Sequence, residues 1–218
     1  MAGLLLVVLF IFNEVDLSGL TSSSPDPDLE SLTNPPPFKR VPPTSAKEGA
    51  FTRLDGCILI PDERANDGDS FHLRHGKESY HFRLYFVDAP EKYRHRYNGE
   101  RLAEQGEYFG ISREEDTLAM GRAARDLTLK ILERARFSVW TRWERVYGSD
   151  RYYALIEIQN PGEGAVLLHE ILVRQGLARI HTKGIDLPSS RPWQAQKKAL
   201  RNLEERAKSA AAGAWKKR

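Results

Sequence analysis

The sequence predicts an α+β fold in which helices pack on a small antiparallel β-barrel. Two observations predict it: short runs rich in β-branched and aromatic residues recur between residues 57 and 158, and longer stretches carry apolar residues at intervals of three and four. With 218 residues, 40% of them hydrophobic, the chain is long enough to bury the core of one such domain and barely long enough for two.

Five runs have strand character and supply the predicted barrel. The clearest is HFRLYFV at residues 81–87, which ends before Ala89-Pro90, and Gly76-Lys77 ahead of it has the composition of a hairpin turn. The five runs cover residues 57–60, 70–73, 81–87, 137–141 and 152–158.

Three helices are expected from apolar periodicity. The first carries Ala124, Leu127, Ile131 and Leu132 on one face, and Gly176 stops the second, since helices commonly end at a glycine in the left-handed conformation. The three helices cover residues 121–135, 165–175 and 193–207.

The first residues of the chain differ in composition from the rest. Residues 4–12 read LLLVVLFIF, which is shorter than the roughly 20 residues of a membrane-spanning helix and suits the core of a signal peptide. No Lys or Arg precedes this run and no Ala-x-Ala cleavage site follows it. An uncleaved membrane anchor and a misassigned start codon are therefore the alternatives.

We divide the chain into a signal peptide or anchor at residues 1–20, a Pro/Ser-rich linker at 21–50 and a globular domain at 51–218. Seven of the twelve prolines fall between residues 21 and 45, and proline denies the backbone regular hydrogen bonds. The signal peptide predicts a secreted or extracytoplasmic protein, anchored to the membrane only if the segment stays uncleaved. Cys57 is the single cysteine, which excludes an intramolecular disulfide framework.

Charge is nearly balanced over the chain as a whole. The 33 basic and 30 acidic side chains leave a net charge of +3, which excludes a histone-like polycation and an acidic disordered protein. Residues 191–218 alone hold nine basic and two acidic side chains. This basic end of the chain would either steer a polyanion toward the site or keep the surface soluble.

Carboxylates and one arginine gather around the strand at residues 81–87. Asp67 and Asp69 stand at a turn, Arg83 lies in the strand, and Asp88 and Glu91 follow it. Clustered carboxylates repel one another, and a hard cation such as calcium, which binds carboxylate and carbonyl oxygens, removes that repulsion. By local pattern alone, a plain hairpin turn and a strand terminator explain these residues equally well.

Three segments in this order resemble the staphylococcal nuclease (thermonuclease) family. They are DGDS at residues 67–70, RLYFVDAPE at 83–91 and HEILVRQGLARI at 169–180, and the resemblance covers about residues 54–215. It implies a five-stranded OB-fold β-barrel with three packed helices. It also implies a calcium-dependent endonuclease that hydrolyses phosphodiester bonds of DNA and RNA and leaves 3′-phosphate ends.

The resemblance further implies roles for the clustered residues. Asp69, Asp88 and the backbone carbonyl of Ala89 would bind calcium. Glu91 would position or deprotonate the attacking water, a role that needs a carboxylate within hydrogen-bond reach of that water. Arg83 would hold the phosphate from one side.

The second phosphate-binding arginine is open at this point. Two extra residues separate Tyr147-Gly148 from Arg151, where the family has Tyr-Gly-Arg directly. Arg151 is favoured because the residues after it keep the family's register, and Arg142 and Arg145 are the alternatives. Tyr147 would bind substrate by stacking on a base.

We expect a monomer without a stable protein partner that acts on DNA and RNA in single-stranded or locally opened form. Residues 92–120 are longer than in the family's type member and form either a lid over the substrate or a solvated surface insertion. The competing hypotheses are a catalytically inactive module of the same fold that binds nucleic acid or protein, and a membrane-anchored scaffold, which rests only on residues 4–12.

Overall fold

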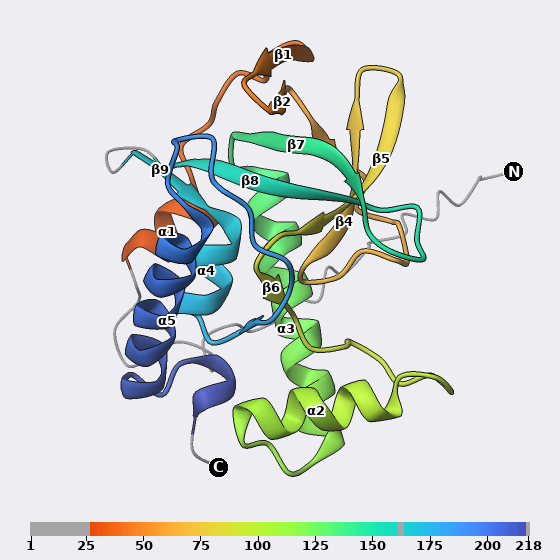
Figure 1. Ribbon diagram of the computed structural model, residues 1–218, viewed down its shortest axis with the longest axis vertical. Helices are drawn as coiled ribbons and strands as arrows, with labels where there is room; N and C mark the ends of the chain where they lie inside the picture. Colours follow the sequence, from red (N-terminus) through yellow and green to blue (C-terminus); the bar gives the residue numbers. More distant parts are fainter. Residues whose placement is uncertain (1–26, 161–163, 217–218) are drawn as a thin grey trace, which may run out of the picture.

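The computed structural model describes residues 27–160 and 164–216, and these residues form an α+β fold, as expected. Figure 1 shows a curved sheet with helices along its flank and beneath it. An eight-stranded sheet has the strand order β1-β2-β7-β8-β5-β4-β3, and β9 pairs with β8. Because β1 and β3 lie at its two ends, the sheet is not closed into a complete barrel.

Neighbouring strands of this sheet are antiparallel, except that β5 and β8 run parallel. Two further short strands, β6 (Val87–Asp88) and β10 (Arg179–Ile180), pair with each other in a separate antiparallel ladder. The strands of the large sheet are β1 (Thr44–Glu48), β2 (Phe51–Asp55), β3 (Ile58–Leu59), β4 (Ser70–His75), β5 (Glu78–Leu84), β7 (Phe137–Arg145), β8 (Tyr152–Asn160) and β9 (Gly164–Leu167).

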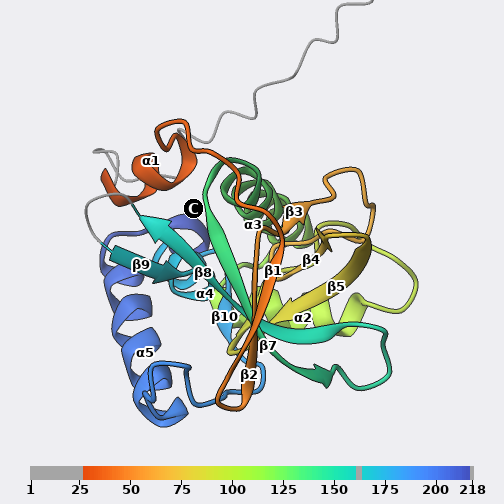
Figure 2. The same ribbon diagram turned by 90° about the horizontal axis from the view of Figure 1, so that it is seen from above.

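Helices surround the sheet at three places. In Figure 1, α4 and α5 lie side by side on one flank, and α2 lies below the sheet against the first turns of α3. Figure 2 shows α1 on the side of β8 and β9. The helices are α1 (Pro27–Thr33), α2 (Gly99–Phe109), α3 (Glu114–Arg134), α4 (Leu168–Arg174), α5 (Trp193–Ser209) and a short 3-10 helix, η2 (Gly213–Trp215).

The apolar face expected on the first long helix is confirmed. Ala124, Leu127, Ile131 and Leu132 of α3 are all buried. They pack with the inner side chains of the sheet into the main core, which includes Phe71, Phe82 and Leu155. Burial of this face explains why the helix holds its position across the sheet.

Two of the expected elements are each split in two. The run at residues 81–87 divides because Phe86 has φ of 73°, a left-handed conformation that a continuing strand does not accommodate. The expected helix at 165–175 is a strand up to Leu167 and a helix only from Leu168. The structure also has more elements than the five strands and three helices expected, because β1, β2, β10, α1, α2 and η2 lie outside the predicted ranges.

The described part of the expected linker is folded onto the domain. In α1, Leu32 is only 2% exposed, and Ser31 Oγ donates a hydrogen bond of 2.8 Å to Asn160 Oδ1. β1 pairs with β2 along its length. The packed unit therefore begins before residue 51, and residues 27–33 and 44–48 form a helix and a strand within the range expected for the linker.

The expected signal peptide or anchor at residues 1–20 lies outside the described residues. Among the residues that the structure does describe, no helix combines the length and the apolar character needed to cross a membrane.

Candidate active site

The clustered charges meet where β4, β5, β6 and β10 come together. Ser70 at the start of β4 pairs with Arg83 near the end of β5. Asp88 in β6 pairs with Arg179 in β10. Backbone pairing thus brings Arg179, which is distant in the sequence, beside Asp88, and the acidic residues just before β4 beside the end of β5.

Arg83 bridges the two expected metal carboxylates. Its Nη1 lies 3.2 Å from Asp69 Oδ1 and its Nη2 lies 2.7 Å from Asp88 Oδ1. All three side chains are buried. Burial opposes the charge of the guanidinium, but Asp69 and Asp88 outweigh it and raise the pKa of Arg83. Removing Arg83 would take its ion-pair partner from the buried Asp69 carboxylate, and breaking a buried pair in this way costs about 3–5 kcal/mol.

Asp88 is the most heavily bonded of the carboxylates. Besides Arg83, its oxygens accept hydrogen bonds from Arg179 Nε at 2.8 Å, from Gln105 Nε2 at 3.0 Å and from Arg101 Nη2. Burial alone would raise the pKa of Asp88, but the charges of Arg101 and Arg83 lower it. Asp88 is therefore held ionised.

Glu91 is held at its carboxylate and at its backbone. Arg101 Nε lies 3.0 Å from Oε1 of Glu91, and Asn98 Nδ2 donates to Oε2 over 3.4 Å. The backbone N–H of Glu91 donates to Gln105 Oε1 over 3.0 Å. With its side chain 20% exposed, the Glu91 carboxylate is both fixed and open to water.

Arg151 reaches the site and Arg145 does not. Arg151 Nη1 donates to Ser70 Oγ over 3.2 Å, and Arg83 Nη1 donates to the same oxygen over 3.4 Å. Burial, followed by the charge of Arg83, lowers the pKa of Arg151. Arg145 instead is exposed and binds the hydroxyl of Tyr152 at 3.2 Å.

The other alternative, Arg142, is an exposed residue of β7. Of the three candidates, Arg151 is thus the one that contacts the charged cluster, through Ser70. Tyr147 stands fully exposed, at 102%, in the turn between β7 and β8. It lies four residues before Arg151, so the same turn carries both.

The turn at residues 67–70, which we call the acidic turn, carries an excess of negative charge. Asp67 is partly exposed, and loss of hydration followed by the charge of Asp69 raises the pKa of its carboxyl, although Lys92 acts in the opposite direction. A bound cation would relieve this repulsion. The donors near this turn are hard oxygens from Asp69, Asp88 and the Ala89 carbonyl, which suit calcium.

These donors already have partners within the chain. Asp69 Oδ2 accepts a 2.7 Å bond from the Ala89 N–H, and the Ala89 carbonyl accepts a 3.0 Å bond from Gln105. No group of three or more His, Cys, Asp or Glu side chains able to hold a metal occurs in residues 27–160 and 164–216. A cation here would therefore rely on backbone oxygen and water besides the two carboxylates.

Close packing against α3 holds the acidic turn and the Glu91 segment in place. A Cβ on Gly68 would lie 2.7 Å from the Cβ atoms of both Ala89 and Ala124, and Thr128 Oγ1 donates to the Gly68 carbonyl over 2.7 Å. A Cβ on Gly121 would collide with the carbonyl oxygens of Pro90 and Glu91. Both glycines are needed for this close approach.

Three residues of the site were not anticipated: Arg101, Gln105 and Arg179. Arg101 and Gln105 are four apart in the sequence, which places them on one face of α2. That spacing was the available signal, but the helix itself was not expected. Arg179 belongs to the HEILVRQGLARI segment, whose pairing with β6 appears only in the fold.

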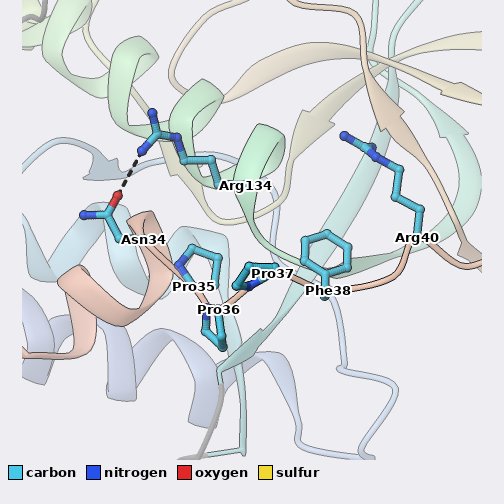
Figure 3. Close-up of a pocket in the computed structure, with 7 residues that line it drawn as sticks. All are labelled: Asn34, Pro35, Pro36, Pro37, Phe38, Arg40 and Arg134. Carbon is cyan, nitrogen blue, oxygen red and sulfur yellow. Dashed lines mark hydrogen bonds between the residues drawn. The ribbon is translucent and has the colours of Figure 1, made fainter.

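A cavity of about 400 Å³ lies elsewhere, beside the proline run that follows α1 (Figure 3). Asn34, Phe38, Arg40 and Arg134 line it together with three prolines. Two of the lining residues are bonded to each other, since Arg134 Nη1 donates to Asn34 Oδ1 over 2.9 Å. It contains no carboxylate and is not the candidate active site.

The fold and the site together define a domain of the nuclease-like OB class: a curved sheet on helices, with paired carboxylates and arginines at the end of β5. Residues 81–217 match the family model described as staphylococcal nuclease homologue. The chain belongs to this family. A comparison with curated proteins gives no match.

Proposed function

We propose that this protein is a calcium-dependent, sugar-nonspecific endonuclease that hydrolyses phosphodiester bonds of DNA and RNA and leaves 3′-phosphate ends. One observation carries the proposal: Arg83 and Arg151 converge on the Ser70 hydroxyl beside Asp69 and Asp88. Two guanidinium groups next to paired carboxylates suit a phosphodiester that gathers negative charge as it is attacked.

The two arginines would bind the phosphate and stabilise the charge that forms on it. Guanidinium groups stay charged and bind two oxygens at once. Arg83 is fixed by its carboxylate partners, so its charge costs little reorganisation when the reaction occurs. Arg151 is bonded to the neutral hydroxyls of Ser149 and Ser70, which suits it to take up the leaving oxygen.

Glu91 would orient the attacking water and accept its proton. Its carboxylate is partly exposed, and its backbone is fixed by Gln105. A general base of this kind contributes typically 10²- to 10⁴-fold to the rate.

The donor chemistry of the site fits calcium. Asp69, Asp88 and the Ala89 carbonyl would hold the ion, and the excess negative charge around Asp67 supports a cation at this place. When bound, calcium supplies Lewis-acid polarisation of the phosphate and a template for in-line attack.

The groups gathered here recognise phosphate and not sugar, which supports action on both DNA and RNA. Tyr147, fully exposed beside Arg151, would stack on an unpaired base. The basic C-terminal end would steer the polyanion toward the site. Export through residues 1–20, with a membrane anchor as the alternative, and a monomeric state without a stable protein partner complete the proposal.

The inactive binding module is the second candidate, because the ion pairs from Arg101 and Arg179 to Asp88 form a network that needs no metal to neutralise this carboxylate. The full chain should be incubated with plasmid, single-stranded DNA and RNA, once with calcium and once with EGTA, followed by mass spectrometry of the product ends. Degradation that requires calcium and yields 3′-phosphates supports the nuclease. Binding without cleavage supports the module.

A further inference from the structure

Residues 92–97, between β6 and α2, alternate basic and aromatic side chains in the order KYRHRY. We call them the aromatic-basic loop. Tyr93 is 43% and Tyr97 75% exposed, and each ring centroid lies 6.4 Å from that of His95 between them. A row of three rings thus borders solvent immediately after Glu91.

A buried amide gives this loop its shape. Asn98 is only 4% exposed, and its Oδ1 accepts a 2.9 Å bond from the backbone N–H of His95. Its Nδ2 donates to the Tyr93 carbonyl over 3.0 Å and to Glu91 Oε2 over 3.4 Å. The same side chain thus orders the loop and contacts the proposed general base, and a preordered surface loses less entropy when it binds a ligand.

The charge of the loop complements a polyanion. No acidic residue occurs between residues 92 and 99. The Arg96 guanidinium lies 4.2 Å from the centroid of Tyr97, and that of Arg64 lies 5.8 Å from the centroid of Tyr93. Lys92 Nζ also lies 5.4 Å from the Tyr93 centroid, but Lys92 is buried and its Nζ is bonded to the backbone carbonyls of Arg64 and Asn66. Arg94 is paired with Glu114, so Arg64 and Arg96 are the exposed cations that flank the rings.

We propose that the aromatic-basic loop binds single-stranded nucleic acid next to the scissile phosphate. Unpaired bases stack on Tyr93 and Tyr97, and Arg64 and Arg96 contact the adjoining phosphates. Every base has an aromatic face, so the surface accepts strands of any sequence, whereas a duplex keeps these faces stacked internally. The inference rests on the proposed nuclease function and deepens it by naming the surface that holds the single strand.

The test measures how tightly nucleic acid binds to a variant that holds the substrate without cleaving it. In a Glu91→Gln background with calcium, fluorescence anisotropy measures the dissociation constants for a labelled oligothymidylate and for a labelled hairpin duplex. Tyr93→Ala with Tyr97→Ala removes both rings, and Tyr93→Phe with Tyr97→Phe keeps them. Phe38→Ala is the matched control, an exposed aromatic beside the Arg134 end of α3.

We expect the double alanine variant to bind the single strand at least tenfold more weakly, since each stacked base contributes about 1–3 kcal/mol, with little change for the duplex. The double phenylalanine variant and Phe38→Ala should bind like the parent. An unchanged affinity for the single strand, or an equal loss for both ligands, overturns the loop proposal alone. A parent that binds neither ligand overturns the proposed function as well.

Discussion

Arg151 Nη1 lies 3.2 Å from Ser70 Oγ, across 81 positions of sequence. The contact joins the turn before β8 to the acidic turn before β4, and Arg83 donates to the same hydroxyl. Arg83 stays held by Asp69 and Asp88, whereas Arg151 is bonded here to the neutral hydroxyls of Ser70 and Ser149 and can turn toward a phosphate.

Arg151→Ala should lower the rate of cleavage by about 10²- to 10³-fold, as loss of a donor to the transition state typically does. Arg145→Ala, which removes an exposed arginine bonded to Tyr152, should leave the rate within about twofold, a range we take from the small effects usual for surface substitutions. The measurement is the cleavage rate of a labelled single strand in calcium. Equal losses in both variants would contradict the assignment.

Arg101→Gln should tighten calcium binding. The Arg101 guanidinium pairs with Asp88, a proposed calcium ligand, and with Glu91, so its positive charge competes with the cation for Asp88. Removing the positive charge that lies against Asp88 should lower the calcium dissociation constant by about tenfold. Isothermal titration calorimetry on wild type and variant measures it, and weaker binding by the variant would be the opposite of the expected result.

Gly121→Ala should destabilise the fold and impair cleavage together. The added Cβ has to displace either α3 or the Pro90–Glu91 backbone, and overpacking of this kind costs about 1–3 kcal/mol. Denaturant unfolding and cleavage rates measure the two effects. Gly110→Ala is the matched control. Its added Cβ has open space, but its left-handed φ of 68° strains the backbone, so this variant should lose stability without displacing the Pro90–Glu91 backbone. A fully active Gly121→Ala protein would mean that the close approach does not position Glu91.

His169 should make the fold less stable in acid. It is fully buried, its Nε2 lies 3.0 Å from Gln196 Nε2, and burial lowers its pKa to about 4. The neutral form is thus preferred in the folded state, so its contribution is complete above the unfolded pKa near 6.5 and is lost as the pH falls toward 4. The shift corresponds to about 3 kcal/mol.

The comparison uses His169→Gln, which has no titrating ring. Between pH 7 and pH 4 the wild-type free energy of unfolding should fall by more than that of the variant, as measured by urea unfolding. Parallel pH profiles for the two proteins would show that His169 does not contribute.

Part of the site follows from local sequence alone. The Gly76-Lys77 turn makes residues equally distant from it pair, which sets Ser70 opposite Arg83 and His75 opposite Glu78. The acidic turn is thereby placed beside the arginine before any tertiary contact is considered. The helix face of α3 follows in the same way from its apolar period.

The rest depends on tertiary contacts that local patterns do not contain. Only four residues of α2 are buried, and two of these are Gln105 and Gly106, so its apolar stripe was too thin to indicate a helix. Arg101 and Gln105 were hidden with it. In α1, Leu32 is buried against the domain, although the proline-rich composition around it is typical of a linker.

In the proposed function, Glu91 serves phosphodiester hydrolysis that depends on calcium. The most direct measurement is the cleavage rate of a labelled single-stranded DNA by wild type in calcium, wild type in EGTA and Glu91→Gln in calcium, with the fold checked by circular dichroism. We expect cleavage by wild type in calcium, none in EGTA, and a loss of about 10²- to 10⁴-fold in a folded Glu91→Gln protein. Equal cleavage by wild type and Glu91→Gln, or cleavage that persists in EGTA, would contradict it.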